Sequence, residues 1–358
     1  MTSRPKTRVY ITTDVECAEE RVIGGKPMPA QGYDLRVWCR FANQPRELGI
    51  GLIMSELEAH GMRGTFYTEV FGAHHFGIEG LREACQAMRG RGHDVQLHTH
   101  PIQRRADYRS RGEEPAGDNI SDYDAARQAE LLTEGIEILG RCGIPKDEVV
   151  SFRAGNFGAN NDTWSAMAKA GLRVSSNYNP CYFQKNCKMR SDESGAGLFY
   201  VKTGRGADGV WELPISNFRE EGGNYRHVQI TAVSLDEMKD HLREARRLGI
   251  GEVTVVTHSF EFCHIDSIEK KSGRTNTVNL LRLRGLCRFL REHSDEFEVE
   301  TVGALAKRLG TGNPQTDPVR VVEMPRGKRR HKARRLVEQA FKRAEAKIPI
   351  GFGRFVGA

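Results

Sequence analysis

The chain has 358 residues, of which 38% are hydrophobic and 28% are charged, a composition typical of a folded protein with an ample core. Lys and Arg outnumber Asp and Glu by 54 to 47, but residues 326–343 alone carry a larger net positive charge than this excess. The body is therefore near neutral, which excludes a basic nucleic-acid-binding domain, and no apolar run has the length of a membrane span.

The N-terminal part of the sequence alternates strand patterns with helix patterns. Runs of β-branched and aromatic residues predict strands, and apolar residues at helical spacing before a glycine predict helices. The elements expected here are strand 9–13, helix 48–57, strand 65–70, helix 81–88 and strand 93–97. Polar loops are expected at 17–44 and 101–120.

The same alternation continues to residue 309. The elements expected are a helix within 121–139, strand 148–153, helix 164–170, strands 174–176 and 210–214, helix 235–248, strand 253–257, helix 279–293, strand 299–302 and helix 303–309. This order predicts a mainly parallel sheet, closed or nearly closed as a barrel. We expect one domain over residues 1–312, then a linker and a basic helical extension over residues 313–358.

Ionisable side chains recur where the predicted strands end. They are Asp14 and Glu16 after the first strand, His98 and His100 after the third, Arg153 after the next, and His258 after the strand 253–257. Active sites of α/β barrels lie at the carboxyl ends of the strands. Taken singly, each residue could be a solvated loop side chain, a helix cap or an ion-pair partner. Taken together, they are the parts needed for metal-assisted hydrolysis.

At these residues the sequence resembles the polysaccharide deacetylase family, also called the NodB-like family or carbohydrate esterase family four, over residues 8–305. The family's first motif, Thr-Phe-Asp-Asp, is similar to residues 12–16 and implies that Asp14 is the catalytic base. Val15 stands where the family has a metal-binding aspartate. Some members use Asp-x-Glu, so the resemblance implies Glu16 as the ligand, because side chains two residues apart on extended backbone point the same way.

The second family motif carries two histidines and is similar to residues 98–101. The resemblance implies that His98 and His100 bind the metal, although their spacing is shorter than the family's usual one. Residue 102 is Ile, so the longer spacing is not available. His93, on the preceding strand, is expected to be structural.

The third and fifth family motifs supply groups that handle protons. The third is similar to residues 152–156 and implies that Arg153 keeps the base carboxylate ionised and oriented. The fifth, a strand ending in Leu-x-His, is similar to residues 255–260 and implies that His258 is the general acid.

The fourth family motif is similar to residues 211–214. The resemblance implies that Trp211 forms a wall against the sugar and that Glu212 steadies the arginine of the third motif. The alternative for Trp211 is an ordinary place in the hydrophobic core.

The resemblance implies a distorted (β/α) barrel of the NodB type with fewer than eight strands and a groove at its carboxyl face. It implies a divalent metal ion, zinc first, with cobalt or nickel as alternatives, because one carboxylate and two imidazoles suit these ions. The implied reaction is hydrolysis of the acetamide of an N-acetylated amino sugar, which leaves a free amine and acetate.

Eight cysteines without a CxxC pair are typical of a protein from a reducing compartment, and the N-terminus leads directly into a strand. We therefore expect a cytoplasmic enzyme acting on a glycan or glycolipid precursor, free, nucleotide-linked or lipid-linked. The alternatives are an amidase acting on other C–N bonds, a metal hydrolase of another family, and an inactive barrel that binds carbohydrate.

The extension at the C-terminus predicts a basic helix over residues 328–347. It carries an apolar stripe made of Leu336, Val337, Ala340, Phe341 and Ala344. Such a helix is expected either to dock on the body of the protein or to lie on an anionic membrane.

Overall fold

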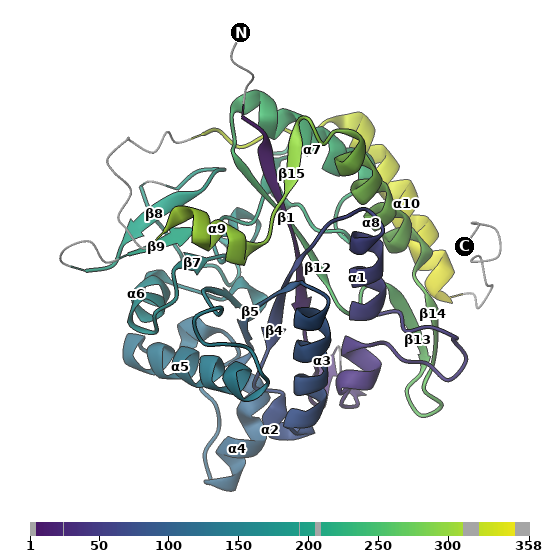
Figure 1. Cartoon of the computed structure of the whole chain (residues 1–358). Coiled ribbons are helices and arrows are strands. Elements are labelled where there is room, and N and C mark those ends of the chain that lie inside the picture. The colour runs from purple at the N-terminus through teal and green to yellow at the C-terminus, as the bar shows by residue number, and fades with distance from the viewer. Residues whose placement is uncertain (1–4, 24, 193, 205–208, 311–321, 348–358) are drawn as a thin grey trace.

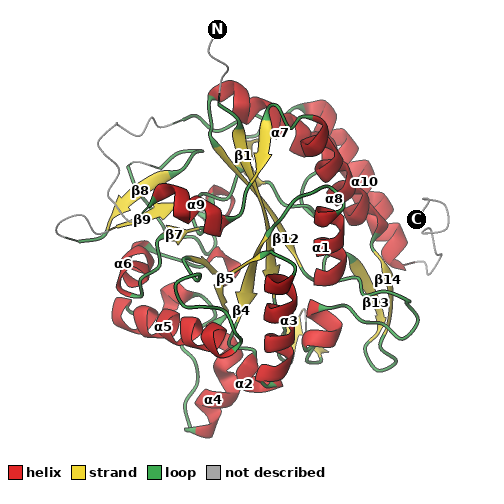
Figure 2. Cartoon of the chain, in the orientation of Figure 1, coloured by secondary structure: helices red, strands yellow, loops and turns green. Residues whose placement is uncertain are grey.

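The computed structural model describes residues 5–23, 25–192, 194–204, 209–310 and 322–347, and its strands form one central sheet with helices around it (Figure 1, Figure 2). In spatial order the strands are β12 (Glu252–His258), β1 (Thr7–Val15), β4 (Thr65–Glu69), β5 (Asp94–Thr99), β6 (Ser151–Ala154), β7 (Val174–Ser175), β9 (Gly209–Glu212) and β8 (Phe199–Lys202). A further strand, β15 (Phe297–Val299), pairs with β1.

The described part of this path contains seven parallel strands, from β12 to β9, and β8 is antiparallel at its edge. Within the described residues the hydrogen-bonded path does not return from β8 to β12, so pairing does not close the barrel. Backbone hydrogen bonds from Val256 of β12 to Val228 and from Ile230 to Val256 fill part of this gap. The predicted α/β fold with a mainly parallel sheet is confirmed; with β15 included, the described sheet has nine strands, and its path stays open.

The helices follow the strands as the alternation predicts. Their bounds are α1 (Ile50–Glu58), α2 (Ala73–Phe76), α3 (Ile78–Gly90), α4 (Arg105–Ser110), α5 (Ala125–Arg141), α6 (Asn161–Lys169), α7 (Leu235–Leu248), α8 (Thr277–Glu292), α9 (Val302–Leu309) and α10 (Arg329–Lys347). Short antiparallel pairs stand apart from the main sheet: β2 (Arg21–Ile23) with β3 (Lys26–Met28), β10 (Asn217–Arg219) with β11 (Tyr225–His227), and β13 (Cys263–Ser267) with β14 (Ser272–Thr275). The sequence patterns did not predict the hairpin β2–β3 or the helix α4, which lie in two of the expected loops.

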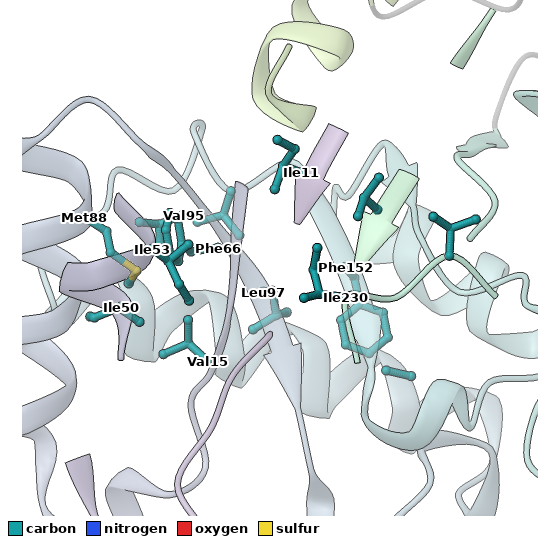
Figure 3. Packing of buried hydrophobic residues seen from close by; sticks show 14 of the residues in the cluster. Ile11, Val15, Ile50, Ile53, Phe66, Met88, Val95, Leu97, Phe152 and Ile230 are labelled. Carbon is teal, nitrogen blue, oxygen red and sulfur yellow. The ribbon is translucent and has the colours of Figure 1, made fainter. Parts of the chain in front are cut away.

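The core lies between the parallel strands and the surrounding helices. In β1 every residue except Arg8 is buried, as expected for a parallel strand that is covered on both faces. Ile11 of β1 and Phe66 of β4 belong to the same cluster as Ile53 of α1 and Met88 of α3 (Figure 3). Full burial of one such side chain stabilises a fold by about 1.5–3 kcal/mol.

The amino ends of the strands are filled by α9. Tyr10 and Tyr67, which are fully buried, belong to a cluster with the apolar residues of this helix. Thr65 Oγ1 and Asp94 Oδ2 accept hydrogen bonds from the first two backbone amides of α9, at 2.9 and 2.8 Å. These bonds satisfy amides that a helix start otherwise leaves unpaired. The amino end of the sheet is therefore sealed.

The basic helix α10 lies along α7 and α8 (Figure 1). Arg335, which is 2% exposed, donates to Glu237 at 2.9 Å and to Glu220 at 2.6 Å. Arg282 of α8 donates to Glu338 of α10 at 2.9 Å. Of the two expected arrangements, docking on the body is therefore observed, and charged side chains make the contact. Most of the predicted linker lies at 311–321, outside the described residues.

The apolar stripe of α10 faces away from the body. Leu336 is 55% exposed and Val337 is 70% exposed. This orientation is the reverse of an ordinary amphipathic helix, whose apolar side faces the core. Among the helices described, none is both long and apolar enough to cross a bilayer.

Candidate active site

The carboxyl ends of β1, β5, β6 and β12 meet around one cavity of about 320 Å³. The strand register brings the ionisable residues together, because Asp14 is paired with His258 across β1 and β12. His98 is likewise paired with Arg153 across β5 and β6. Parallel strands end at the same edge of a sheet, so residues distant in sequence become neighbours here.

Glu16, His98 and His100 form the group that best fits a metal ion. Glu16 Oε1 lies 3.3 Å from His98 Nε2 and 3.5 Å from His100 Nε2. One donor atom from each of the three residues lies within 4.8 Å of the others. His98 is 1% exposed, whereas Glu16 and His100 line the cavity. A carboxylate oxygen and two imidazole nitrogens are the donors that zinc, cobalt and nickel accept.

The other nitrogen of each ring fixes its orientation. His98 Nδ1 lies 2.8 Å from the backbone oxygen of Arg153, and His100 Nδ1 lies 3.0 Å from Asp118 Oδ2. Nδ1 is therefore the donor in both rings, and Nε2 is the nitrogen that faces Glu16 and would bind a metal after losing its proton, the usual arrangement around a metal-binding histidine. Gly155 is also required, since a Cβ there would lie 2.5 Å from the ring of His100.

The short spacing of His98 and His100 follows from backbone geometry. β5 ends at Thr99, and His100 keeps an extended conformation, with φ −116° and ψ 95°. Both rings therefore point to the same side of the chain. Pro101 then begins a short 3₁₀ turn that ends the strand.

The charges at this group shift the pKa values of its members. Burial raises the pKa of Glu16, but hydrogen bonds from His100 and His98 outweigh this effect and hold the pKa well below its usual range. Burial lowers the pKa of His100, whereas the carboxylates of Asp118 and Glu16 more than reverse this and raise it well above its usual value. A metal ion and a proton therefore compete for His100 Nε2.

Asp14 is held by the buried guanidinium of Arg153. Arg153 Nη1 donates to Asp14 Oδ1 at 2.6 Å, and the arginine side chain is fully buried. The guanidinium also donates to Thr12 and Ser176 and stacks 4.1 Å from the ring centre of Tyr67. The second oxygen of Asp14, Oδ2, lies 3.8 Å from His258 Nε2. One carboxylate oxygen is therefore anchored, and the other faces the reaction space.

His258 is oriented by Glu261, which sequence reasoning missed. His258 Nδ1 lies 2.9 Å from Glu261 Oε1, and Glu261 accepts further hydrogen bonds from Thr257 and Gln229. Burial lowers the pKa of His258, but the carboxylates of Glu261, Glu16 and Asp14 outweigh it and raise the pKa to about 9. Nε2 is left pointing toward Asp14 and Glu16. The sequence indicated this pairing, because Glu261 follows His258 by only three residues.

The positions expected for Trp211 and Glu212 need correction. Trp211 packs edge-on against Tyr200 and against the cluster around α9, at the amino end of the sheet. Glu212 is fully buried, and it accepts hydrogen bonds from Trp164 Nε1 and from the backbone amide of Asn177. Neither residue lines the cavity, and in the described structure Glu212 makes no contact with the arginine. β9 lies beyond β6 and β7 in the sheet, and this motif carries core and loop contacts.

The cavity does have an aromatic wall, made by Phe157 and Tyr182. Their ring centres are 5.1 Å apart, and both residues line the cavity. Phe157 and its neighbour Asn156 have positive φ angles of 53° and 57°, a strained backbone that turns this segment toward the site. The sequence offered no periodic signal for either residue, because both lie in irregular segments.

Two further buried polar residues have structural partners, His93 at the amino end of β5 and Glu69 at the carboxyl end of β4. His93 Nδ1 accepts from the backbone amide of Gly64 at 3.1 Å, and its Nε2 lies 3.0 Å from Glu58, as expected for a structural histidine. Glu69 accepts hydrogen bonds from two backbone amides at 2.8 Å. Burial raises the pKa of Glu69. Both carboxylate oxygens of Glu69 therefore accept hydrogen bonds from the backbone of the protein.

No protein-family model and no curated protein matches the sequence. Among solved structures, the chain is similar to a protein from Mycobacterium smegmatis described as a polysaccharide deacetylase, with TM-score 0.51, 15% identity, and coverage of 89% of this chain and 96% of that one. It is similar to a protein from Parabacteroides distasonis described as a glycoside hydrolase/deacetylase, with TM-score 0.52, 11% identity, and coverage of 87% and 73%. At these identities the likeness shows the fold alone. The chain has the polysaccharide deacetylase, or NodB-like, fold.

Proposed function

We propose that this chain is a metal-dependent hydrolase that removes the N-acetyl group from an N-acetylated amino sugar. The observation that carries the proposal is one cavity lined by Asp14, Glu16, His100 and His258, with His98 directly behind it. A ligand group, a carboxylate with one unanchored oxygen and a separately oriented imidazole are the parts that amide hydrolysis requires. The NodB-like fold of the chain supports the same conclusion.

Glu16, His98 and His100 would hold the ion, and zinc fits this donor set best, with cobalt and nickel as alternatives. When bound, such an ion supplies Lewis acidity toward the substrate carbonyl and lowers the pKa of water. The three residues leave the cavity side of the group open, as a catalytic rather than structural site requires.

The remaining residues divide the proton transfers. Asp14 Oδ2 accepts the proton of the attacking water, while Arg153 holds the other carboxylate oxygen at 2.6 Å. His258 Nε2 then donates a proton to the leaving amine, and Glu261 keeps the ring in the orientation that this step needs. The 3.8 Å between Asp14 Oδ2 and His258 Nε2 puts both within reach of one tetrahedral carbon.

The proposed substrate is a cytoplasmic glycan or glycolipid precursor, free, nucleotide-linked or lipid-linked. The aromatic wall of Phe157 and Tyr182 favours a sugar ring over a small linear amide. Eight free cysteines are typical of a reducing compartment. Binding alone requires neither a base nor an acid, so the paired Asp14–Arg153 and His258–Glu261 groups argue against an inactive carbohydrate-binding barrel.

Acetate release from a panel of N-acetylated sugars, nucleotide sugars and lipid-linked sugars tests this proposal. The full chain is assayed after chelation and after addition of zinc, cobalt or nickel. We expect release that requires the ion and is lost in Asp14→Asn. A metal-loaded protein that cleaves only non-sugar amides would establish the amidase alternative, and no cleavage of any amide would overturn hydrolysis.

We further propose that α10 rests on anionic lipid through its outward face. Leu336 and Val337 are exposed, and Lys332, Arg343 and Lys347 beside them are exposed as well. An apolar ridge flanked by cations matches a bilayer surface that contains anionic headgroups. The inward ion pairs of Arg335 and Glu338 would remain in place in this arrangement.

Sedimentation with phosphatidylglycerol vesicles tests this second proposal. The full chain is expected to pellet with these vesicles and not with phosphatidylcholine vesicles. A Leu336→Ser/Val337→Ser variant should lose most of the binding, whereas Val22→Ser, which removes another exposed apolar residue, should not. Equal pelleting of all three proteins, or no pelleting of any of them, would contradict the proposed membrane contact.

A further inference from the structure

A buried arginine beside the candidate metal group has a role that the proposed hydrolysis leaves unassigned. Arg36, in the turn Tyr33–Val37, is 9% exposed and lines the cavity. Its guanidinium stacks 3.5 Å from the ring centre of Phe260, and Ser259 Oγ donates to its backbone oxygen at 2.9 Å. The segment that follows the general acid candidate therefore holds the guanidinium of Arg36 through Phe260 and its backbone through Ser259.

The hydrogen-bonding capacity of Arg36 is almost entirely unused. Its Nε is buried and has no hydrogen-bond partner in the described structure. Its nearest charge is Glu16, whose Oε2 lies 3.6 Å from Nη2, too far for a hydrogen bond. A guanidinium has five N–H donors, and a buried donor without a partner carries a free-energy penalty. Such a group is therefore poised to bind an acceptor that enters the cavity.

A second guanidinium lines the same cavity. Arg21, on β2 at the mouth, is exposed, and it lies near enough to Arg36 to act on it as a like charge. Among the described residues, Arg21 has no ion-pair partner. Asp14 is already paired with Arg153, and Glu16 Oε1 faces the imidazoles. Within the described structure Arg36 therefore has only the 3.6 Å ion pair with Glu16 Oε2, and the two neighbouring guanidiniums keep N–H donors for an oxyanion.

We propose that Arg36, assisted by Arg21, forms a phosphate subsite, so that the substrate is an N-acetylated amino sugar with a phosphoryl group on its anomeric carbon. This inference rests on the proposed deacetylation and narrows its substrate class. In a 2-acetamido sugar the acetamide and the anomeric oxygen stand on neighbouring ring carbons. A ring that enters the cavity with its anomeric carbon toward Arg36 would therefore bring the phosphate to this guanidinium while the acetamide lies at the ligand group.

Positional isomers of one substrate test the subsite. The metal-loaded full chain is assayed with N-acetylglucosamine, its 1-phosphate, its 6-phosphate and UDP-N-acetylglucosamine. We expect kcat/KM for the 1-phosphate to exceed that for the neutral sugar by about 10- to 100-fold, as charge-assisted hydrogen bonds provide. The 6-phosphate carries the same charge on a different carbon and should gain little. Activity on UDP-N-acetylglucosamine would distinguish a diphosphate-linked substrate from a free monophosphate.

Substitutions then assign the effect to its residues. In Arg36→Gln the ratio of kcat/KM between 1-phosphate and neutral sugar should fall about tenfold, and Arg36→Lys should retain part of it. Arg21→Gln, at an exposed position where folding is not at risk, should lower the ratio by a smaller factor. Arg288→Gln removes an exposed charge that does not line the cavity, and should leave all rates unchanged.

Calorimetric binding separates this inference from the hydrolysis itself. Tighter binding of the 1-phosphate than of N-acetylglucosamine, lost in Arg36→Gln, would support the subsite even if no acetate were released from any sugar. Equal affinities and equal kcat/KM values for the two ligands would overturn it. An Arg36→Gln variant that slows both substrates equally, with an unchanged ratio, would also overturn it and make Arg36 a positioning residue for Glu16.

Discussion

The two ends of the parallel strands contain similar polar side chains, but their surroundings differ. At the amino end, Asp94 and Thr65 accept hydrogen bonds from backbone amides of α9, and Tyr10 donates to Glu300 at 2.7 Å. At the carboxyl end, Asp14 Oδ2 and Glu16 Oε1 face imidazole nitrogens across a cavity. A buried carboxylate bound to backbone amides is committed to the fold, whereas one that faces titratable groups and open space is available for chemistry.

The largest expected effect at the carboxyl end is that of Asp14→Asn. The proton acceptor is lost while the shape of the side chain is kept, so acetate release should fall about 10²- to 10⁴-fold. Bound metal, measured by elemental analysis, should stay at the unmodified level. An active Asp14→Asn protein would show that Asp14 is not the base. Its carboxylate would then serve the fold, as Asp94 does at the amino end.

His98→Ala should remove the ion itself. With one of its three donors gone, bound metal should fall to background, and activity should fall with it. His93→Ala is the matched control, because this buried histidine of the same strand region binds Gly64 and Glu58 instead. The control should lower thermal stability and keep the metal. Full metal occupancy in His98→Ala would exclude the proposed ligand set.

His258→Ala should mainly lower kcat, by about 10²-fold, with little change in KM. Glu261→Gln keeps the ring but weakens the carboxylate that orients it, so its decrease in kcat should be smaller. Steady-state kinetics on the best substrate of the panel measure both. An effect confined to KM would identify His258 as a binding residue.

Asp118→Asn tests a partner that acts through His100. Loss of the carboxylate at Nδ1 should weaken metal affinity by about 10- to 100-fold, and excess metal should restore the activity. Competition with a chelator measures the affinity. If activity is lost and metal affinity is unchanged, Asp118 contacts the substrate and does not support the ligand.

Asp94→Ala should have the smallest effect on catalysis and a clear effect on stability. It leaves the Gly303 amide and the Thr65 hydroxyl without their acceptor, which should lower the free energy of unfolding by about 1–3 kcal/mol. Chemical denaturation and the acetate assay measure the two quantities. A large loss of activity without destabilisation would contradict the division between the two ends.

Most of the ionisable residues singled out in the sequence lie together at the candidate site, because strand tips are encoded locally. Asp14, His98 and His258 each follow a recognisable strand, and parallel strands bring their tips to one edge. Asp118 and Phe157 lie in irregular segments, where no periodicity ties a side chain to a direction. Trp211 was misplaced because a strand pattern does not show which end of a short strand reaches the cavity.

The sequence alone determined three features: the alternation of strands and helices, the residue types at the strand tips, and the shortened spacing at His100. Each of them depends on neighbours within a few residues. Tertiary structure decided which nitrogen of each imidazole is free, which carboxylate oxygen is unanchored and where Arg36 points. These features depend on contacts between residues far apart in the chain, such as Arg153 with Asp14, which are 139 residues apart. Only the packing of loops and strands against one another determines such contacts.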